Sequence, residues 1–195
     1  WLNERGLQWI DKEDWIYETS FDLSDAVYSK NNIHILFNGL DTYADVYLNN
    51  EKIISANNMF RQWTADIKKI ARRTGNILKV YFHSPVKTDI PKWDALPVYY
   101  KAANDQSENG GIFDKKLSVV ARKAGYHYGW DWGPRFVTSG IWRPVFITSW
   151  DVARIENIQV IQEQVSAKQA ILKTVVEIVS ESDFKNAIVG VTDKA

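Results

Sequence analysis

Apolar and polar residues alternate with a period of two along much of the chain. The alternation covers residues 15–21, 33–37, 44–48 and 78–82. Successive side chains of a strand point to opposite faces of a sheet, so this period predicts β-strands with one buried face. The pair Asn49-Asn50 follows the third segment, and asparagine tolerates a positive φ, so we expect a tight hairpin there.

Strand signals return in the second half of the chain, after an irregular stretch. Residues 90–111 contain prolines and glycines without a regular period, which predicts a long loop of the kind that often carries function. One helix is predicted to begin at Thr64, which could cap it, because Ile67 and Ile70 share a face and Gly75 follows the expected end. Later strands are expected at residues 117–121, 145–150, 158–161, 172–179 and 187–191.

This strand-rich pattern places the chain in the all-β class and divides it in two. Pro144 and the Trp150-Asp151 step mark a boundary between a long part and a short one. We therefore predict a β-sandwich domain over residues 1–151 and the start of a second β-domain over residues 152–195. The second part holds only three strand signals, which are too few for a stable sandwich of its own.

The composition argues against several classes of function but does not identify one. Of the 195 residues, 45% are hydrophobic, which is enough for a core, and 24 basic residues balance 24 acidic ones. This balance gives no net attraction to nucleic acid or acidic membranes, and no apolar run approaches the ~20 residues that span a bilayer. The chain has no cysteine, which excludes disulfides and thiolate metal sites. Its nine tryptophans are a weak indication of carbohydrate binding.

The candidate chemistry lies in residues 122–143, where aromatic side chains and glycines surround Asp131. Trp130 and Trp132 flank this acid, and Gly133-Pro134 follows, which favours a loop. An indole offers a flat face to the C–H face of a sugar ring, and a carboxylate accepts hydrogen bonds from paired hydroxyls. These three residues are therefore the candidate substrate-binding residues. The alternative is a turn whose carboxylate accepts backbone N–H groups, with both indoles in a core.

Other chemistries find little support in the residue pattern. Arg122 and Arg143 flank the segment and could pair with Asp131, or could be surface charges. The three histidines are widely spaced, so we expect no metal site and no cofactor. No phosphate-binding loop or nucleophile motif occurs, and no pair of carboxylates stands out as a glycosidase pair.

The chain resembles a known family most clearly over Arg122–Val145. This segment, RKAGYHYGWDWGPRFVTSGIWRPV, is similar to the end of the first domain of β-mannosidases in glycoside hydrolase family two. The Trp-Asp-Trp-Gly-Pro run is the specific part, because it separates β-mannosidases from their β-galactosidase and β-glucuronidase relatives. Three upstream segments agree and extend the resemblance over most of residues 1–150: LQWIDKEDWIYETSF (Leu7–Phe21), FNGLDTYADVYLNN (Phe37–Asn50) and NNMFRQWTADI (Asn57–Ile67).

The resemblance implies a galactose-binding-like jelly-roll sandwich over residues 1–151, lacking its first residues, and the start of an immunoglobulin-like sandwich over residues 152–195. It also implies a (β/α)₈ barrel outside this chain, which supplies both catalytic glutamates of a retaining, exo-acting β-mannosidase. The Trp-Asp-Trp loop would reach the terminal mannose, which assigns substrate binding to Trp130, Asp131 and Trp132. The expected partners are a mannose-containing oligosaccharide and the barrel of the same enzyme chain, with no nucleic acid and no membrane.

Two interpretations from other classes stay open. One is a free-standing carbohydrate-binding module, and the other is a non-enzymatic β-sandwich interaction domain whose aromatic residues form only a core and an interface. The resemblance favours a periplasmic, extracellular or lysosomal location over the cytoplasm. Linkage preference, chain-length preference and oligomeric state are not encoded in any pattern of this chain.

Overall fold

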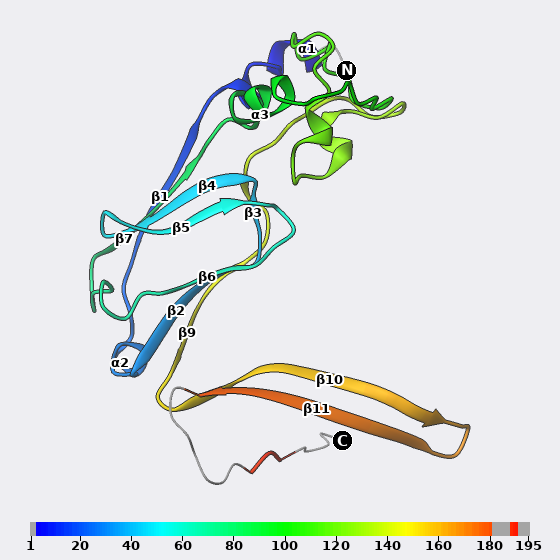
Figure 1. The fold of residues 1–195 in the computed structure, drawn as a ribbon. Coiled ribbons are helices and arrows are strands. Elements are labelled where there is room, and N and C mark those ends of the chain that lie inside the picture. The colour runs from blue at the N-terminus through cyan, green and yellow to red at the C-terminus, as the bar shows by residue number, and fades with distance from the viewer. Residues whose placement is uncertain (1–2, 181–187, 191–195) are drawn as a thin grey trace. The chain divides into compact units, whose positions relative to one another are not determined.

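The computed structural model describes residues 3–180 and 188–190 of the chain (Figure 1). They form two compact units, which divide between Ser149 and Trp150. The strands are β1 (Trp15–Phe21), β2 (Asn32–Phe37), β3 (Leu40–Asp41), β4 (Tyr43–Leu48), β5 (Glu51–Asn57), β6 (Trp63–Asp66), β7 (Asn76–Phe82), β8 (Gly140–Ile141), β9 (Val145–Trp150), β10 (Ala153–Val165) and β11 (Ala170–Ser180).

Two sheets make up the frame of the first unit. One has the strand order β1-β7-β4-β5, and the other has the order β6-β2-β9 (Figure 1). A short antiparallel pair joins β3 to β8, with Asp41 opposite Gly140. Apolar residues from both sheets form one core cluster, so the arrangement is a β-sandwich.

The period of two in the sequence is the burial pattern of the core strands. In β7, Leu78, Val80 and Phe82 are buried, while Ile77 faces outward and is 45% exposed. Val80 lies opposite Val46 of β4 in an antiparallel register, and both side chains are buried in the core. Strands expected at 15–21, 33–37, 44–48, 78–82 and 145–150 are all present, which confirms the alternation argument.

The predicted hairpin at Asn49-Asn50 is confirmed. Both residues have a positive φ, 51° at Asn49 and 71° at Asn50, and they connect β4 to β5. The Asn49 side chain also ties the turn to its surroundings, because its Nδ2 donates to the carbonyl of Ile70 over 2.8 Å and its Oδ1 accepts from the N–H of Ile77 over 3.0 Å.

The helix predicted to begin at Thr64 is wrong. Thr64 lies in β6, opposite Leu36 of β2, and a single turn follows in which Ile70 and Ala71 donate to the carbonyl of Ile67. Ile67 is completely buried in the core. Pairing with β2 therefore decides the conformation of residues 63–66. The helical spacing of Ile67 and Ile70 reflects only the single turn that follows β6.

Two further expectations for the middle of the chain are wrong. Helix α3 (Pro85–Asp94) occupies the beginning of the predicted loop, with Ser84 as its N-cap accepting from the N–H of Lys87 over 3.0 Å and Pro91 inside it. The strand expected at 117–121 is a 3₁₀ turn, η2 (Leu117–Val119), because no neighbouring strand pairs with it. The remaining short helices are α1 (Glu4–Leu7), η1 (Ile10–Lys12), α2 (Asp25–Tyr28) and η3 (Gly125–Tyr128).

Residues 3–12 and 85–139 gather at one end of the sandwich, where we call them the lobe (Figure 1). The lobe has its own small core and consists mostly of turns and short helices. The buried residues of that core are Val86, Trp93, Ile112, Leu117, Tyr128 and Val137.

The second unit is a long antiparallel hairpin of strands β10 and β11, as expected from residues 158–161 and 172–179. Residues 188–190 form no strand, and the rest of the strand expected at 187–191 lies outside the described residues. That residues 152–195 open an immunoglobulin-like domain stays a prediction. Within the described part of the chain, no helix has the length and apolar character to span a membrane.

We expect replacement of Phe82 by Ala to destabilise the first unit by about 3–5 kcal/mol, because Phe82 is completely buried between β1 and β4 and its loss leaves a cavity. Ile16 is the matched control: it is 56% exposed on the neighbouring strand, and Ile16→Ala should change the stability by no more than about 0.5 kcal/mol. Urea unfolding of both variants measures the difference, and equal losses would contradict the position of the core.

Candidate functional site

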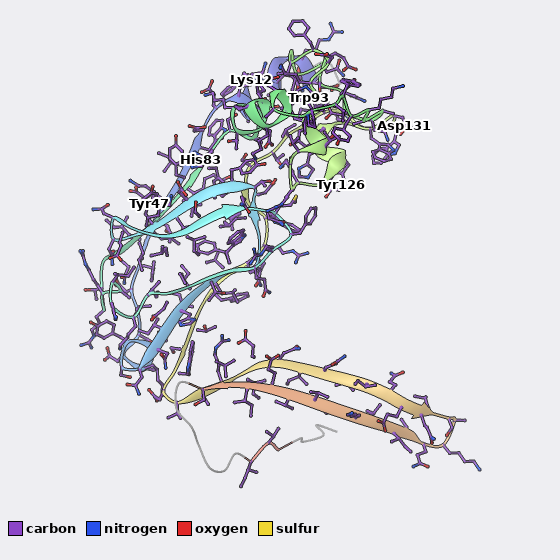
Figure 2. The ribbon with its side chains drawn as sticks, in the orientation of Figure 1. Lys12, Tyr47, His83, Trp93, Tyr126 and Asp131 are labelled. Atoms are coloured by element: carbon purple, nitrogen blue, oxygen red, sulfur yellow. The ribbon has the colours of Figure 1, made fainter. Side chains whose placement is uncertain are left out.

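The predicted binding residues lie on one tight turn in the lobe. The N–H of Trp130 donates to the carbonyl of Gly133 over 3.1 Å, and the N–H of Gly133 donates back over 3.3 Å. Asp131 and Trp132 occupy the two positions at the tip, and both are exposed. Asp131 lies at the outer edge of the lobe (Figure 2). The structure thus brings the three predicted residues together.

The carboxylate of Asp131 is not used to close this turn. It makes no hydrogen bond and no ion pair with any residue that the structure describes. The alternative in which it accepts local N–H groups is therefore not the observed geometry. Neither flanking arginine pairs with it: Arg122 forms no ion pair within the described residues, and the guanidinium of Arg143 lies 4.2 Å from the centre of the Trp142 ring.

Gln106 and Gly129 hold the base of the turn. The Nε2 of Gln106 donates to the carbonyl of Trp130, and the backbone N–H of Gln106 donates to the carbonyl of Tyr128 over 2.8 Å. Gly129 has a φ of 106°, and a Cβ at this position would lie 2.7 Å from the Cδ of Gln106. Only glycine fits both the backbone conformation and this close approach.

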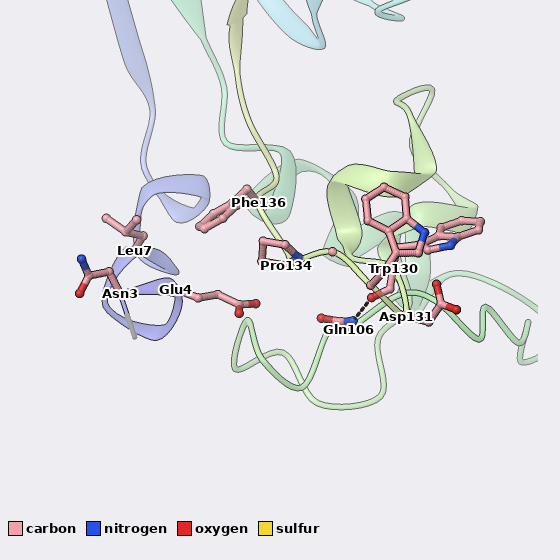
Figure 3. Close-up of a pocket in the computed structure, with 10 residues that line it drawn as sticks. Asn3, Glu4, Leu7, Gln106, Trp130, Asp131, Pro134 and Phe136 are labelled. Atoms are coloured by element: carbon pink, nitrogen blue, oxygen red, sulfur yellow. Dashed lines mark hydrogen bonds between the residues drawn. The ribbon is translucent and has the colours of Figure 1, made fainter. Parts of the chain in front are cut away.

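A pocket of about 380 Å³ opens beside the turn (Figure 3). Leu7 and Phe136 form an apolar wall on one side, and Trp130 lies on the other. Glu4 of α1 also lines it, opposite the turn. Aromatic walls with a few polar groups at the rim are the usual composition of a small-molecule site. The complete lining is Asn3, Glu4, Leu7, Gln106, Trp130, Asp131, Trp132, Gly133, Pro134 and Phe136.

Arg135 anchors the outgoing side of the turn and was missed by the sequence analysis. Its side chain is completely buried, and its Nη1 donates to Asp11 Oδ2 over 2.5 Å and to Gln8 Oε1 over 2.6 Å. Its backbone N–H donates to the Oε1 of Glu4 over 3.1 Å. The sequence signal for it is an arginine directly after Gly133-Pro134 in an otherwise aromatic run.

His127 lies in η3, three residues before Trp130. Its Nδ1 is 3.2 Å from the Oγ1 of Thr138 and 3.7 Å from the Oδ2 of Asp41. Burial and the neighbouring ammonium of Lys123 lower the pKa of His127 to about 4, and the Asp41 carboxylate only partly opposes this shift. Across the described residues, no three His, Asp or Glu side chains converge closely enough to hold a metal ion.

With this geometry in view, comparison with known proteins identifies the family. The model of the glycosyl hydrolase 2 galactose-binding-like domain matches residues 2–143. The chain belongs to this family. The expected all-β, galactose-binding-like sandwich is thereby confirmed, as is the resemblance to β-mannosidases, because the similar proteins carry that name.

Three relatives show the extent of the similarity. The chain is 32% identical over 155 residues to the β-mannosidase of Capra hircus, which covers 79% of this chain and 17% of that protein. It is 33% identical over 146 residues to β-mannosidase B of Thermothelomyces thermophilus, covering 74% and 16%. The crystal structure of the β-D-mannosidase from Dictyoglomus thermophilum matches with a TM-score of 0.78 at 34% identity, covering 92% of this chain and 21% of that one. The chain thus spans about a fifth or less of the length of these relatives.

We expect His127→Asn to reduce the acid sensitivity of the fold. The unfolded chain takes up a proton near the ordinary pKa of 6.5, whereas folded His127 does so at about 4. The unfolded state therefore binds more protons in this window, and stability is lost as the pH falls from about 6.5 to about 4, by on the order of 3 kcal/mol. Urea unfolding at about pH 7 and about pH 4.5 should show a smaller difference in the variant. An equal difference would contradict the burial of a neutral imidazole.

Proposed function

We propose that this chain is the sugar-binding N-terminal part of a retaining, exo-acting β-mannosidase of glycoside hydrolase family two. The observation that carries the proposal is the exposed Asp131 carboxylate, which has no protein partner among the described residues and stands between two indoles at the edge of a pocket. The match to the family and the names of its β-mannosidase relatives support the substrate class.

The site would hold a terminal mannose by two kinds of contact. The carboxylate of Asp131 would accept hydrogen bonds from two neighbouring hydroxyls, each contributing about 1.5–3 kcal/mol when it is shielded from water. Trp130, which is 37% exposed, and Trp132, which is 78% exposed, would cover the apolar face of the ring. These contacts are far from a scissile bond, so their role is to orient the sugar and present its anomeric carbon to the catalytic groups.

The catalytic groups belong to another part of the proposed enzyme. A (β/α)₈ barrel joined to this chain would supply the two glutamates, one as acid and base and one as nucleophile. The turn would also block the path beyond the terminal sugar, which favours attack at chain ends.

The exposed aromatic residues of the lobe support this barrel as the partner, because such surfaces usually become covered by another domain. They include Tyr99, Tyr100, Phe113, Tyr126 and Trp132, which are between 47% and 80% exposed.

In the complete enzyme, Asp131→Ala should lower kcat/KM for an aryl β-mannoside by at least about tenfold, because the sugar loses its hydroxyl acceptor. Asp114→Ala is the control: Asp114 is also an exposed acid of the lobe, but it does not line the pocket. That variant should retain kcat/KM within about twofold. Unchanged kinetics of Asp131→Ala would remove the binding assignment.

The 195-residue chain alone should release no nitrophenol from an aryl β-mannoside, because the proposed catalytic glutamates lie in the barrel. Activity of the purified chain would falsify the assignment of the catalytic glutamates to the barrel. Calorimetry with mannose and mannobiose on the same sample separates the binding-module alternative. We expect millimolar or undetectable affinity, because the turn forms only one wall of the site, whereas tight binding would favour a free-standing module.

A further inference from the structure

Asp41, Lys123 and Thr138 form a buried cluster at the root of the segment that carries the turn. We call these three residues the stem clamp. Lys123 Nζ lies 2.5 Å from each carboxylate oxygen of Asp41, and it also donates to the backbone carbonyl of Thr138 over 2.6 Å. The Oγ1 of Thr138 donates to Asp41 Oδ2 over 3.0 Å. A single carboxylate therefore holds both ends of the segment.

The clamp is attached to the frame of the sandwich. Asp41 ends β3, whose register places it opposite Gly140 of β8, and its neighbour Leu40 is completely buried in the core. The hydroxyl of Thr42 donates to Asp41 Oδ1 over 2.5 Å. The carboxylate is thus held by its own strand as well as by the segment, which fixes its place relative to the sandwich.

The burial of Lys123 and Asp41 restricts their contacts to one arrangement. The side chains of Lys123 and Asp41 are 0% and 4% exposed. A buried ammonium must keep its hydrogen-bond partners, because water cannot replace them, and this restricts it to one arrangement. The segment between the two clamped ends has no strand of its own, only η3 and the turn. Its direction is therefore set where it leaves the sandwich, and beyond the stem by the contacts of Arg135 and Gln106.

We propose that the stem clamp positions Asp131, and that Lys123 and Asp41 are positioning residues for sugar binding. This inference rests on the proposed function of Asp131 for its kinetic consequence, but not for its effect on the order of the turn. Asp131 lies eight residues after Lys123 and seven before Thr138, so a small rotation at the stem displaces the carboxylate at the tip. Displacements of about 1 Å can lower an enzymatic rate by as much as about a hundredfold.

A double-mutant cycle in the complete enzyme tests the proposal. Lys123→Met should lower kcat/KM by about tenfold in the native background, but by less than about threefold when Asp131→Ala is already present. A lysine that only stabilises the fold would cause the same fold-loss in both backgrounds, so equal losses would overturn the proposal. Unchanged kcat/KM in folded Lys123→Met would overturn it as well.

Lys92→Met is the control, the loss of a lysine from a partly exposed ion pair: the Lys92 side chain is 44% exposed, whereas that of Lys123 is 0% exposed. Lys92 also pairs with a buried aspartate of the lobe, Asp89, over 2.7 Å, but neither residue belongs to the clamped segment. This variant should keep kcat/KM within about twofold.

Thr138→Val is the second test variant, because it removes the hydroxyl contacts of Thr138 with Asp41 and with His127 and leaves the ion pair intact. Should Lys123→Met fail to fold, the same cycle with Thr138→Val decides, with an expected loss of about threefold that disappears in the Asp131→Ala background.

Hydrogen exchange separates failure of this inference from failure of the proposed function. The amides of residues 129–136 should exchange several-fold faster in the clamp variants than in Lys92→Met, whatever Asp131 binds. Faster exchange in the clamp variants, together with an unchanged kcat/KM in Asp131→Ala, would contradict the sugar-binding role of Asp131 but support the stem clamp. Unchanged exchange in the clamp variants would overturn the clamp itself.

Discussion

Buried ion pairs hold the loops of the lobe in place, as hydrogen bonds between paired strands hold the sandwich. The lobe has little regular structure, so its backbone is not fixed by a continuous ladder of hydrogen bonds. Two buried ion pairs take its place: Asp11 binds Arg135, and Asp41 binds Lys123. A single unpaired charge at such a depth costs several kcal/mol, so each contact strongly favours one arrangement of the loops that it joins.

These contacts connect residues that are distant in the sequence. Arg135 and Asp11 are 124 positions apart, and Lys123 and Asp41 are 82 positions apart. The first contact fastens the turn to the N-terminal segment, which lines the far side of the pocket, and the second fastens its root to the sandwich. The buried acids at these two contacts are thus already paired, whereas the exposed acid at the tip, Asp131, has no partner among the described residues. Asp114 of the lobe is also exposed but does not line the pocket, so it is the pocket that distinguishes Asp131.

Much of the sandwich could be predicted from the sequence. The core strands β2, β4 and β7 bury about every second residue, and this appears in the sequence as alternation. The strands β1 and β9 were also expected from the sequence, although they are only partly buried, and the hairpin appears as Asn49-Asn50. The helix expected at Thr64 failed because spacing cannot show that residues 63–66 pair with β2. Helix α3 was overlooked because Pro91 lies inside it, although Ser84 and Pro85 are typical of a helix start.

The sequence by itself determined the family, the sandwich and the residues of the turn, because a strand period and a short aromatic motif are local properties of the chain. Only the tertiary structure decided that Trp130, Asp131 and Trp132 share a pocket with Glu4, that Arg135 and not its neighbours is the buried arginine, and that Asp41 holds both ends of the segment. Each of these features depends on which side chains, distant in the sequence, contact one another when the chain folds. A local sequence pattern carries no information about such contacts.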